Sequence, residues 1–284
     1  MSSDTDITAN ASLAGHITLG GDLRVPRLGL GAMHLTGNGV WGPPRDPAAA
    51  RRVLQRAVAL GVRFIDTADS YGPAVSEAVI ADALHPYPAD LVIATKGGIV
   101  RPDQPTWASD GRPEHLTAAC EASLRRLKLD RIDLYQLHTI DPDVPLEDSI
   151  GALARLREQG KVRHVGVSNF DVDELERARR IVPVVSVQNR YNAADRSSDD
   201  VLDVCTRDGI AFLPWRPLAL AAGDARHPAR GRLEQAAKQH GWSVPQAALA
   251  WLLQRSPMML PIPGTSNVTH LEELVAAAGF RLDD

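Results

Sequence analysis

The feature that most constrains this fold is an alternation of short apolar segments with helical segments along the whole chain. Eight segments are rich in Val, Ile and Leu, and a stretch with helical periodicity follows each of them. Short strands that are apolar throughout and are joined by helices form parallel sheets with both faces covered. The pattern therefore predicts an α/β fold, and its expected strands are residues 28–30, 63–66, 91–96, 131–138, 162–167, 184–188, 210–213 and 258–262.

Eight such units predict a closed (β/α)8 TIM barrel, and the length of 284 residues suits one. A hairpin at residues 16–25, turning at Gly-Gly-Asp, is expected to close the barrel bottom. The alternative is an open doubly wound sheet, which predicts a glycine-rich phosphate turn after the first strand. Residues 29–31 offer only Gly-Leu-Gly, without a third glycine or an immediate helix, so the barrel is favoured.

The sequence shows no linker or composition shift that marks a second domain. We expect residues 1–15, which are small and polar, to be a flexible leader, and residues 16–284 to form a single barrel domain. The leader lacks the cationic start and apolar centre of a secretory signal, and no apolar run reaches membrane-spanning length. We therefore expect a cytoplasmic protein without a membrane partner, whose Cys120 and Cys205 are reduced thiols. The net charge of -4 argues against a nucleic-acid partner.

Polar or aromatic side chains stand at the ends of seven consecutive expected strands. Barrel enzymes place their chemistry at the carboxyl ends of the strands. Each side chain also has a structural interpretation: Asp66 can cap a helix, Lys96 can extend to solvent, and His138 can be a core histidine. Their joint occurrence at one rim favours a functional site. The residues at the strand ends are Asp66, Lys96, His138, Ser168-Asn169, Gln188, Trp215 and Gly264-Thr265.

Asp66 carries the strongest local argument. A carboxylate at a buried strand end is costly unless a cation pairs with it, and Lys96 closes the next strand in the same way. Tyr71 follows Asp66 by five residues. A phenol, an ammonium and a carboxylate that converge at one rim are expected to form a proton-donor site.

Four segments resemble the aldo-keto reductase family, and the likeness extends from His16 to Phe280. The segments are GVRFIDTA at 61–68, IATK at 93–96, DLYQLH at 133–138 and GVSNF at 166–170. The resemblance, to a short-tailed member, implies a (β/α)8 barrel that reduces aldehyde or ketone carbonyls with NADPH.

The resemblance also implies a catalytic tetrad. Tyr71 is expected to be the general acid, and Lys96 is expected to lower the pKa of that phenol. Asp66 is expected to keep Lys96 charged and oriented, and His138 to position the substrate oxygen by a hydrogen bond.

The same resemblance implies the cofactor contacts. Ser168, Asn169 and Gln188 are expected to hold the nicotinamide carboxamide. Trp215, where the family usually has tyrosine, is expected to stack on the nicotinamide ring. The other expected contacts, besides Asp66, are Gly31, Met33, Arg216, Pro217, Leu218, Gly264, Thr265, Ser266, Asn267 and His270.

The chain departs from the family pattern around the adenosine phosphate. Gly264 and His270 stand where many members have lysine and arginine, and Leu274 replaces an asparagine that meets adenine. NADPH remains the expected cofactor, with Thr265, Asn267 and the helix start as phosphate donors, and NADH is the alternative.

Little sequence follows the last expected helix, so the pocket walls are expected from other loops. These are residues 33–41, 99–107 and 218–227, with Trp41 and Trp107 as aromatic walls or as surface packing.

Two other functions remain in view. A nicotinamide-binding regulatory subunit would show little turnover, and the chain offers only the short leader as a partner-binding extension. A metal-dependent hydrolase would need several histidines and carboxylates at the strand ends, where only His138 and Asp66 occur, so no metal is expected. The expected partner is a small carbonyl substrate, and the resemblance favours a monomer.

Overall fold

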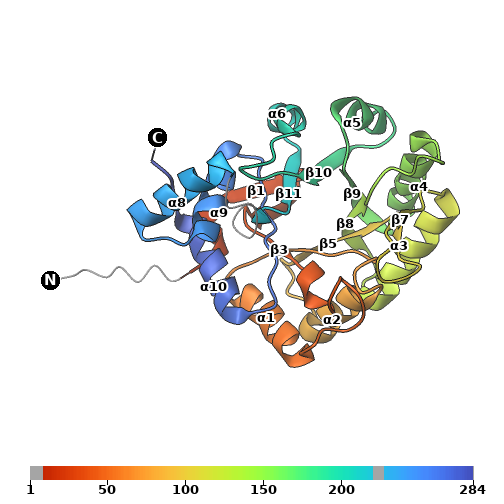
Figure 1. Cartoon of the computed structure of the whole chain (residues 1–284). Coiled ribbons are helices and arrows are strands. Elements are labelled where there is room, and N and C mark those ends of the chain that lie inside the picture. Colours follow the sequence, from red (N-terminus) through yellow and green to blue (C-terminus); the bar gives the residue numbers. More distant parts are fainter. Residues whose placement is uncertain (1–8, 220–226, 284) are drawn as a thin grey trace.

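The parallel strands form one curled sheet whose strand order follows the chain (Figure 1). The computed structural model describes residues 9–219 and 227–283. Every neighbouring pair in this sheet is parallel, as the alternation with helices predicts. The strands are β3 (Leu30–Gly31), β4 (Phe64–Asp66), β5 (Val92–Gly97), β8 (Ile132–Leu137), β9 (Val162–Ser168), β10 (Val184–Arg190) and β11 (Ala211–Trp215).

The expected eighth strand closes the cylinder without a regular ladder of its own. On one side, residues 258–260 exchange backbone hydrogen bonds with Phe212 of β11. On the other side, the Gly31 N–H donates to the Pro263 carbonyl at 3.1 Å. Pro261 and Pro263 lack an N–H. This segment can therefore accept backbone hydrogen bonds, but it cannot donate all those that a regular ladder requires. The predicted (β/α)8 barrel is confirmed, with its last strand less regular than expected.

Helices surround the sheet on its outer side (Figure 1). Their starts follow the expected signals, because Asp46 accepts the Ala49 N–H and the starts at Asp171 and Ser243 form capping boxes. The helices are α1 (Pro47–Ala59), α2 (Val75–Leu84), α3 (Pro113–Leu127), α4 (Leu146–Glu158), α5 (Val172–Arg179), α6 (Asp199–Asp208), α8 (Pro228–His240), α9 (Val244–Arg255) and α10 (Val268–Ala276).

The hairpin of β1 (His16–Leu19) and β2 (Leu23–Pro26) closes the amino-terminal end of the barrel. Its apolar residues are buried in one cluster with barrel-interior side chains such as Phe64 and Leu134. Asp22 in the turn accepts hydrogen bonds from Arg163 and His164, near the start of β9. The chemistry is therefore left to the opposite, open end.

The described part of the expected leader is structured, which corrects the boundary at residue 15. Residues Ala11–Ala14 form a 3-10 helix capped by the Asn10 side chain, and both terminal alanines are buried. The Ala11 N–H donates to the Leu60 carbonyl at 2.9 Å, so this turn covers the end of α1. Residues 1–8 lie outside the described residues.

Two further elements were not expected. The expected loop at residues 99–107 and the residues just after it contain a small antiparallel ribbon of β6 (Ile99–Val100) and β7 (Ala108–Ser109). A short 3-10 helix, Met33–Leu35, follows β3 before α1 begins. Both lie in connections at the open end of the barrel, where local hydrogen bonding sets the backbone more than apolar periodicity does.

Arg27 ties the hairpin to the irregular last strand, and we expect its removal to destabilise the barrel. Its guanidinium donates to the carbonyls of Leu253, Ser256 and Met259. Arg27→Met removes these charged donors and should lower the free energy of unfolding by about 2 kcal/mol. Urea denaturation measures this loss. Arg24→Met, at an exposed hairpin position, is the matched control, and equal losses in the two variants would contradict the role of Arg27.

Candidate active site

Asp66 and Lys96 form a buried ion pair at the ends of two neighbouring strands. Asp66 is the last residue of β4, and Lys96 lies at the corresponding end of β5. Lys96 Nζ lies 2.7 Å from Asp66 Oδ2, and the two side chains are 0% and 3% exposed. Nζ also donates to the Thr67 carbonyl at 2.8 Å. The ammonium is thus held by two fixed oxygens and is itself shielded from solvent.

The second oxygen of Asp66 is held by two amides. Gln188 Nε2 donates to Oδ1 at 2.9 Å and Gln136 Nε2 at 3.2 Å. The sequence analysis did not single out Gln136, although it points into the barrel two positions before His138 at the end of β8. Every polar atom of the carboxylate therefore has a partner, as a buried charge requires.

Tyr71 and His138 lie beside this pair. The Tyr71 hydroxyl is 3.5 Å from Lys96 Nζ. The rings of Tyr71 and His138 meet edge to face, with centroids 5.8 Å apart. Ser70 Oγ lies 3.4 Å from His138 Nδ1, so the residue before Tyr71 holds the imidazole. The structure brings all four residues of the expected tetrad to one place.

A trench of about 440 Å³ opens over these residues. Asp66, Tyr71 and Gln188 lie among its walls, together with most of the expected cofactor residues. His34 and Ala219, from two of the loops expected as pocket walls, also line it, and so does Ile262 of the last strand, which was not expected. The expected cofactor residues in the walls besides Asp66 and Gln188 are Gly31, Met33, Trp215, Arg216, Pro217, Leu218 and Gly264.

Asn169 connects the trench to the end of β9. Its amide oxygen accepts from Trp215 Nε1 at 2.9 Å, and its amide nitrogen donates to Ser168 Oγ and to the His138 carbonyl. Asn169 has a φ of 62°, a left-handed conformation that asparagine tolerates better than most residues. Asn169 thus links the Trp215 ring to the Ser168 hydroxyl, and an aromatic ring beside amide and hydroxyl groups suits a nicotinamide and its carboxamide.

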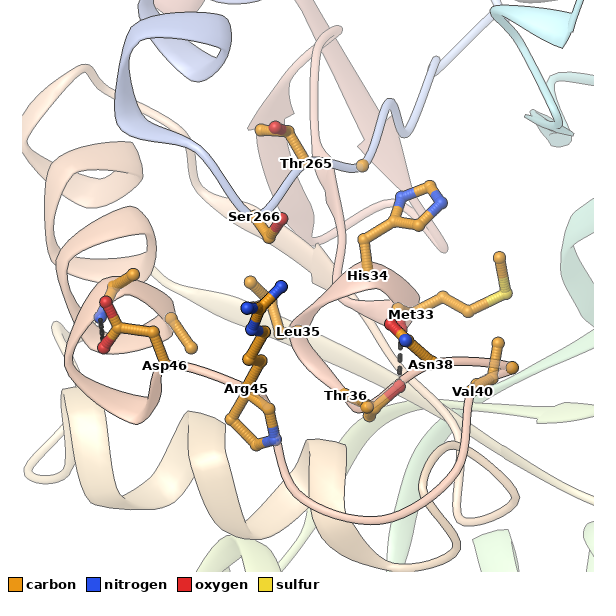
Figure 2. Close-up of a pocket in the computed structure, with 16 residues that line it drawn as sticks. Met33, His34, Leu35, Thr36, Asn38, Val40, Arg45, Asp46, Thr265 and Ser266 are labelled. Atoms are coloured by element: carbon orange, nitrogen blue, oxygen red, sulfur yellow. Dashed lines mark hydrogen bonds between the residues drawn. The ribbon is translucent and has the colours of Figure 1, made fainter. Parts of the chain in front are cut away.

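The expected phosphate-binding residues separate into two groups. Thr265 and Ser266 line a second cavity, shown in Figure 2, that adjoins the trench. Asn267 and His270 are exposed and line neither cavity. The Asn267 side chain caps α10 by accepting the His270 N–H at 3.0 Å.

Of the two alternatives for Trp41 and Trp107, pocket wall or surface packing, the structure favours packing, because neither lines the trench. Trp41 and Trp107 instead contact the guanidinium of Arg101, which lies 5.4 and 3.8 Å from their ring centroids. This contact joins residues 33–46 to the ribbon at residues 99–109. The part of the expected wall at 220–226 lies outside the described residues.

A family model for the "Aldo/keto reductase family" matches residues 27–284. The chain belongs to the aldo/keto reductase family. It is 48% identical to an uncharacterized oxidoreductase of Schizosaccharomyces pombe over 96% of this chain and 88% of that protein. It is 44% identical to pyridoxine 4-dehydrogenase of Escherichia coli, over 93% of both. The solved structure of an aldo-keto reductase from Klebsiella pneumoniae in complex with NADPH is similar, with a TM-score of 0.77 and 26% identity over 94% of this chain and 90% of that one.

The pKa of Tyr71 in this aldo/keto reductase differs from the expectation. Burial raises the pKa of the phenol above its ordinary value of 10.0, because it disfavours the phenolate. Lys96 lowers that pKa, but burial and the charge of Asp66 outweigh it. The expected net lowering is therefore wrong for the unliganded protein, and Lys96 limits the rise instead.

The two neighbours of Tyr71 shift in opposite directions. Burial lowers the pKa of His138 well below its ordinary value of 6.5, and Lys96 lowers it further, so the imidazole is neutral near pH 7. Burial also acts to lower the pKa of Lys96, but the charges and hydrogen bonds of Asp66 and Tyr71 raise it overall. The site thus holds one ammonium and a neutral imidazole.

Features of two other protein classes are absent from the described ranges, 9–219 and 227–283. No helix there is both long and apolar enough to cross a bilayer. No group of three or more His, Cys, Asp or Glu side chains in the same ranges could hold a metal ion.

We expect removal of one partner of the Asp66–Lys96 ion pair to destabilise the folded protein. Lys96→Met leaves the Asp66 carboxylate buried without a cation and should lower the free energy of unfolding by about 3–5 kcal/mol. The double variant Asp66→Asn/Lys96→Met leaves no buried charge and should recover most of that loss. Urea unfolding compares the variants, and a double variant as unstable as Lys96→Met would contradict this account.

Proposed function

We propose that this aldo/keto reductase reduces aldehyde or ketone carbonyls to alcohols, with NADPH as the hydride donor and Tyr71 as the general acid. One observation carries the proposal: the Tyr71 hydroxyl stands 3.5 Å from the Lys96–Asp66 pair in the wall of a trench that suits a nicotinamide. The oxidoreductase activity of the family agrees with this arrangement.

In this proposal the substrate carbonyl oxygen lies between Tyr71, which lines the trench, and His138, whose ring meets that of Tyr71 edge to face. A reduced nicotinamide held in the trench would supply the hydride for the carbonyl carbon, which leaves negative charge on the carbonyl oxygen. Tyr71 gives its proton to that oxygen, and Lys96 stabilises the phenolate that remains. Asp66 keeps Lys96 charged and in place. His138, which is neutral, donates a hydrogen bond and orients the carbonyl.

The residues present fit the nicotinamide end of the cofactor. Trp215 offers an aromatic face, and Ser168, Asn169 and Gln188 offer amide and hydroxyl groups beside it. Gly264 lets the end of the last strand pack against the β3–α1 connection, because a Cβ there would lie 2.8 Å from the Gly31 carbonyl oxygen and from His34 Nδ1. The NADPH bound in the similar Klebsiella pneumoniae structure supports NADPH over NADH. Dissociation constants for both cofactors test the choice, and tighter binding of NADH would overturn it.

Pyridoxal is the first substrate to test. The trench is lined by Tyr71, Trp215 and Ile262, which suits a small aromatic aldehyde, and its volume of about 440 Å³ admits one beside the cofactor. The relative from Escherichia coli named pyridoxine 4-dehydrogenase is 44% identical over 93% of both chains, which supports a pyridoxal-like substrate. A regulatory subunit would bind NADPH and turn over none of a panel of aldehydes.

Replacement of the general acid gives the sharpest test. Tyr71→Phe removes the donated proton and should lower the turnover number by about 10²–10⁴-fold, the usual contribution of a positioned acid. The dissociation constant for NADPH should change by less than about twofold, because the phenyl ring keeps the shape of the trench.

NADPH oxidation followed by absorbance, with pyridoxal or a generic aromatic aldehyde, measures this loss. The matched control is Tyr87→Phe, which removes a hydroxyl that donates to the Leu127 carbonyl far from the trench. Equal turnover of Tyr71→Phe and the control would remove Tyr71 from the mechanism.

The pKa directions predict the pH dependence of reduction. Tyr71 must be protonated, and since its pKa is raised above 10.0, this requirement is met throughout neutral and mildly alkaline pH. His138 is neutral above a pKa well below 6.5, so it causes no loss near neutrality. Single-turnover reduction rates should therefore stay level from pH 6.5 to about pH 9 and fall only at more alkaline pH. An inflection near neutral pH contradicts both directions.

A further inference from the structure

A cavity of about 790 Å³ lies next to the trench, between the β3–α1 connection and the start of α10 (Figure 2). The two cavities share the wall residues Met33, His34 and Gly264. A ligand that lies in the trench can therefore continue past His34 into the second cavity. The reduction chemistry described above uses no residue on the far wall of this cavity.

Arg45 supplies a positive charge to that wall. Figure 2 shows its side chain extending from the β3–α1 connection toward Ser266 at the start of α10. Arg45 is exposed, and within the described ranges no hydrogen bond or ion pair involves it, whereas Arg52 and Arg56 on α1 are each paired with a carboxylate. The neighbouring Asp46 carboxylate is occupied, because it accepts the Ala49 N–H at 2.9 Å and lies 3.6 Å from Arg52.

The opposite wall is also suited to an anion. Ser266 is exposed there, Thr265 is buried beside it, and α10 begins immediately after them. The start of a helix carries partial positive charge from its aligned peptide dipoles. Asp46 is the only carboxylate among the described lining residues, and its partners hold it at the start of α1. Hydroxyl donors, a helix start and a guanidinium therefore face the same space.

We propose that Arg45 binds the phosphate on the adenosine ribose of NADPH in this cavity, and that it selects NADPH over NADH. The inference rests on the proposed function, since it assigns a contact to the same cofactor. NADPH differs from NADH by this one phosphate, and a guanidinium can donate two parallel hydrogen bonds to it. The cavity adjoins the trench at Gly264, so the phosphate end of the cofactor can reach it. Arg45 thereby supplies the cation that neither Gly264 nor the exposed His270 provides.

The test compares cofactor affinities, measured by quenching of tryptophan fluorescence. Arg45→Ala should weaken NADPH binding by about tenfold or more and change the NADH dissociation constant by less than about twofold. Arg45→Lys keeps the charge without the planar fork and should lie between wild type and Arg45→Ala. Arg51→Ala, an exposed arginine on α1 outside the cavity lining, is the matched control and should alter neither affinity.

Adenosine 2′,5′-bisphosphate and adenosine 5′-monophosphate serve as probes without the nicotinamide. The wild-type protein should bind the bisphosphate more tightly, and Arg45→Ala should lose that preference. Unchanged NADPH affinity in Arg45→Ala, or equal weakening of NADPH and NADH, overturns this inference while leaving the proposed reduction intact. A wild-type protein that binds neither nicotinamide cofactor, or one that prefers NADH, overturns both.

Discussion

The rest of the site depends on the ion pair between Asp66 and Lys96, because two charges in a dry barrel end are stable only with all their partners in place. Gln136 and Gln188 supply the amides, and the Thr67 carbonyl supplies the remaining oxygen. All these groups lie on strands or directly after one, where the backbone is rigid. The barrel therefore holds the pair in one geometry and fixes the cation beside the phenol.

Burial decides the protonation of the groups around this pair. It raises the pKa of Tyr71 and lowers that of His138, so the phenol keeps its proton and the imidazole is neutral near pH 7. Lys96 opposes the first shift and reinforces the second. In the proposed reaction the ammonium would matter most after proton transfer, when the phenolate would need a countercharge, and a neutral His138 would orient the substrate without adding a second cation.

Much of the barrel and the tetrad could be predicted from sequence, because parallel strands bring their carboxyl ends to one rim. Four features could not. The last strand has an irregular ladder, since Pro261 and Pro263 lack N–H donors. The 3-10 turn at Ala11–Ala14 depends on contacts with the end of α1. The direction of the Tyr71 pKa depends on how deeply the trench buries the phenol. The hydrogen bond from Gln136 to Asp66 depends on how the barrel places β8 relative to Asp66.

The amino-acid sequence alone determined the order of the strands and the side-chain types at their ends, because apolar periodicity and chain order are local properties. Only the tertiary structure decided how deeply each group is buried and which distant segments meet. Arg45 and Ser266 lie at opposite ends of the sequence, and they face one cavity because closure of the barrel places the β3–α1 connection beside α10. Electrostatic energies depend on these spatial distances and on the exclusion of water. The spacing of residues along the sequence determines neither of them.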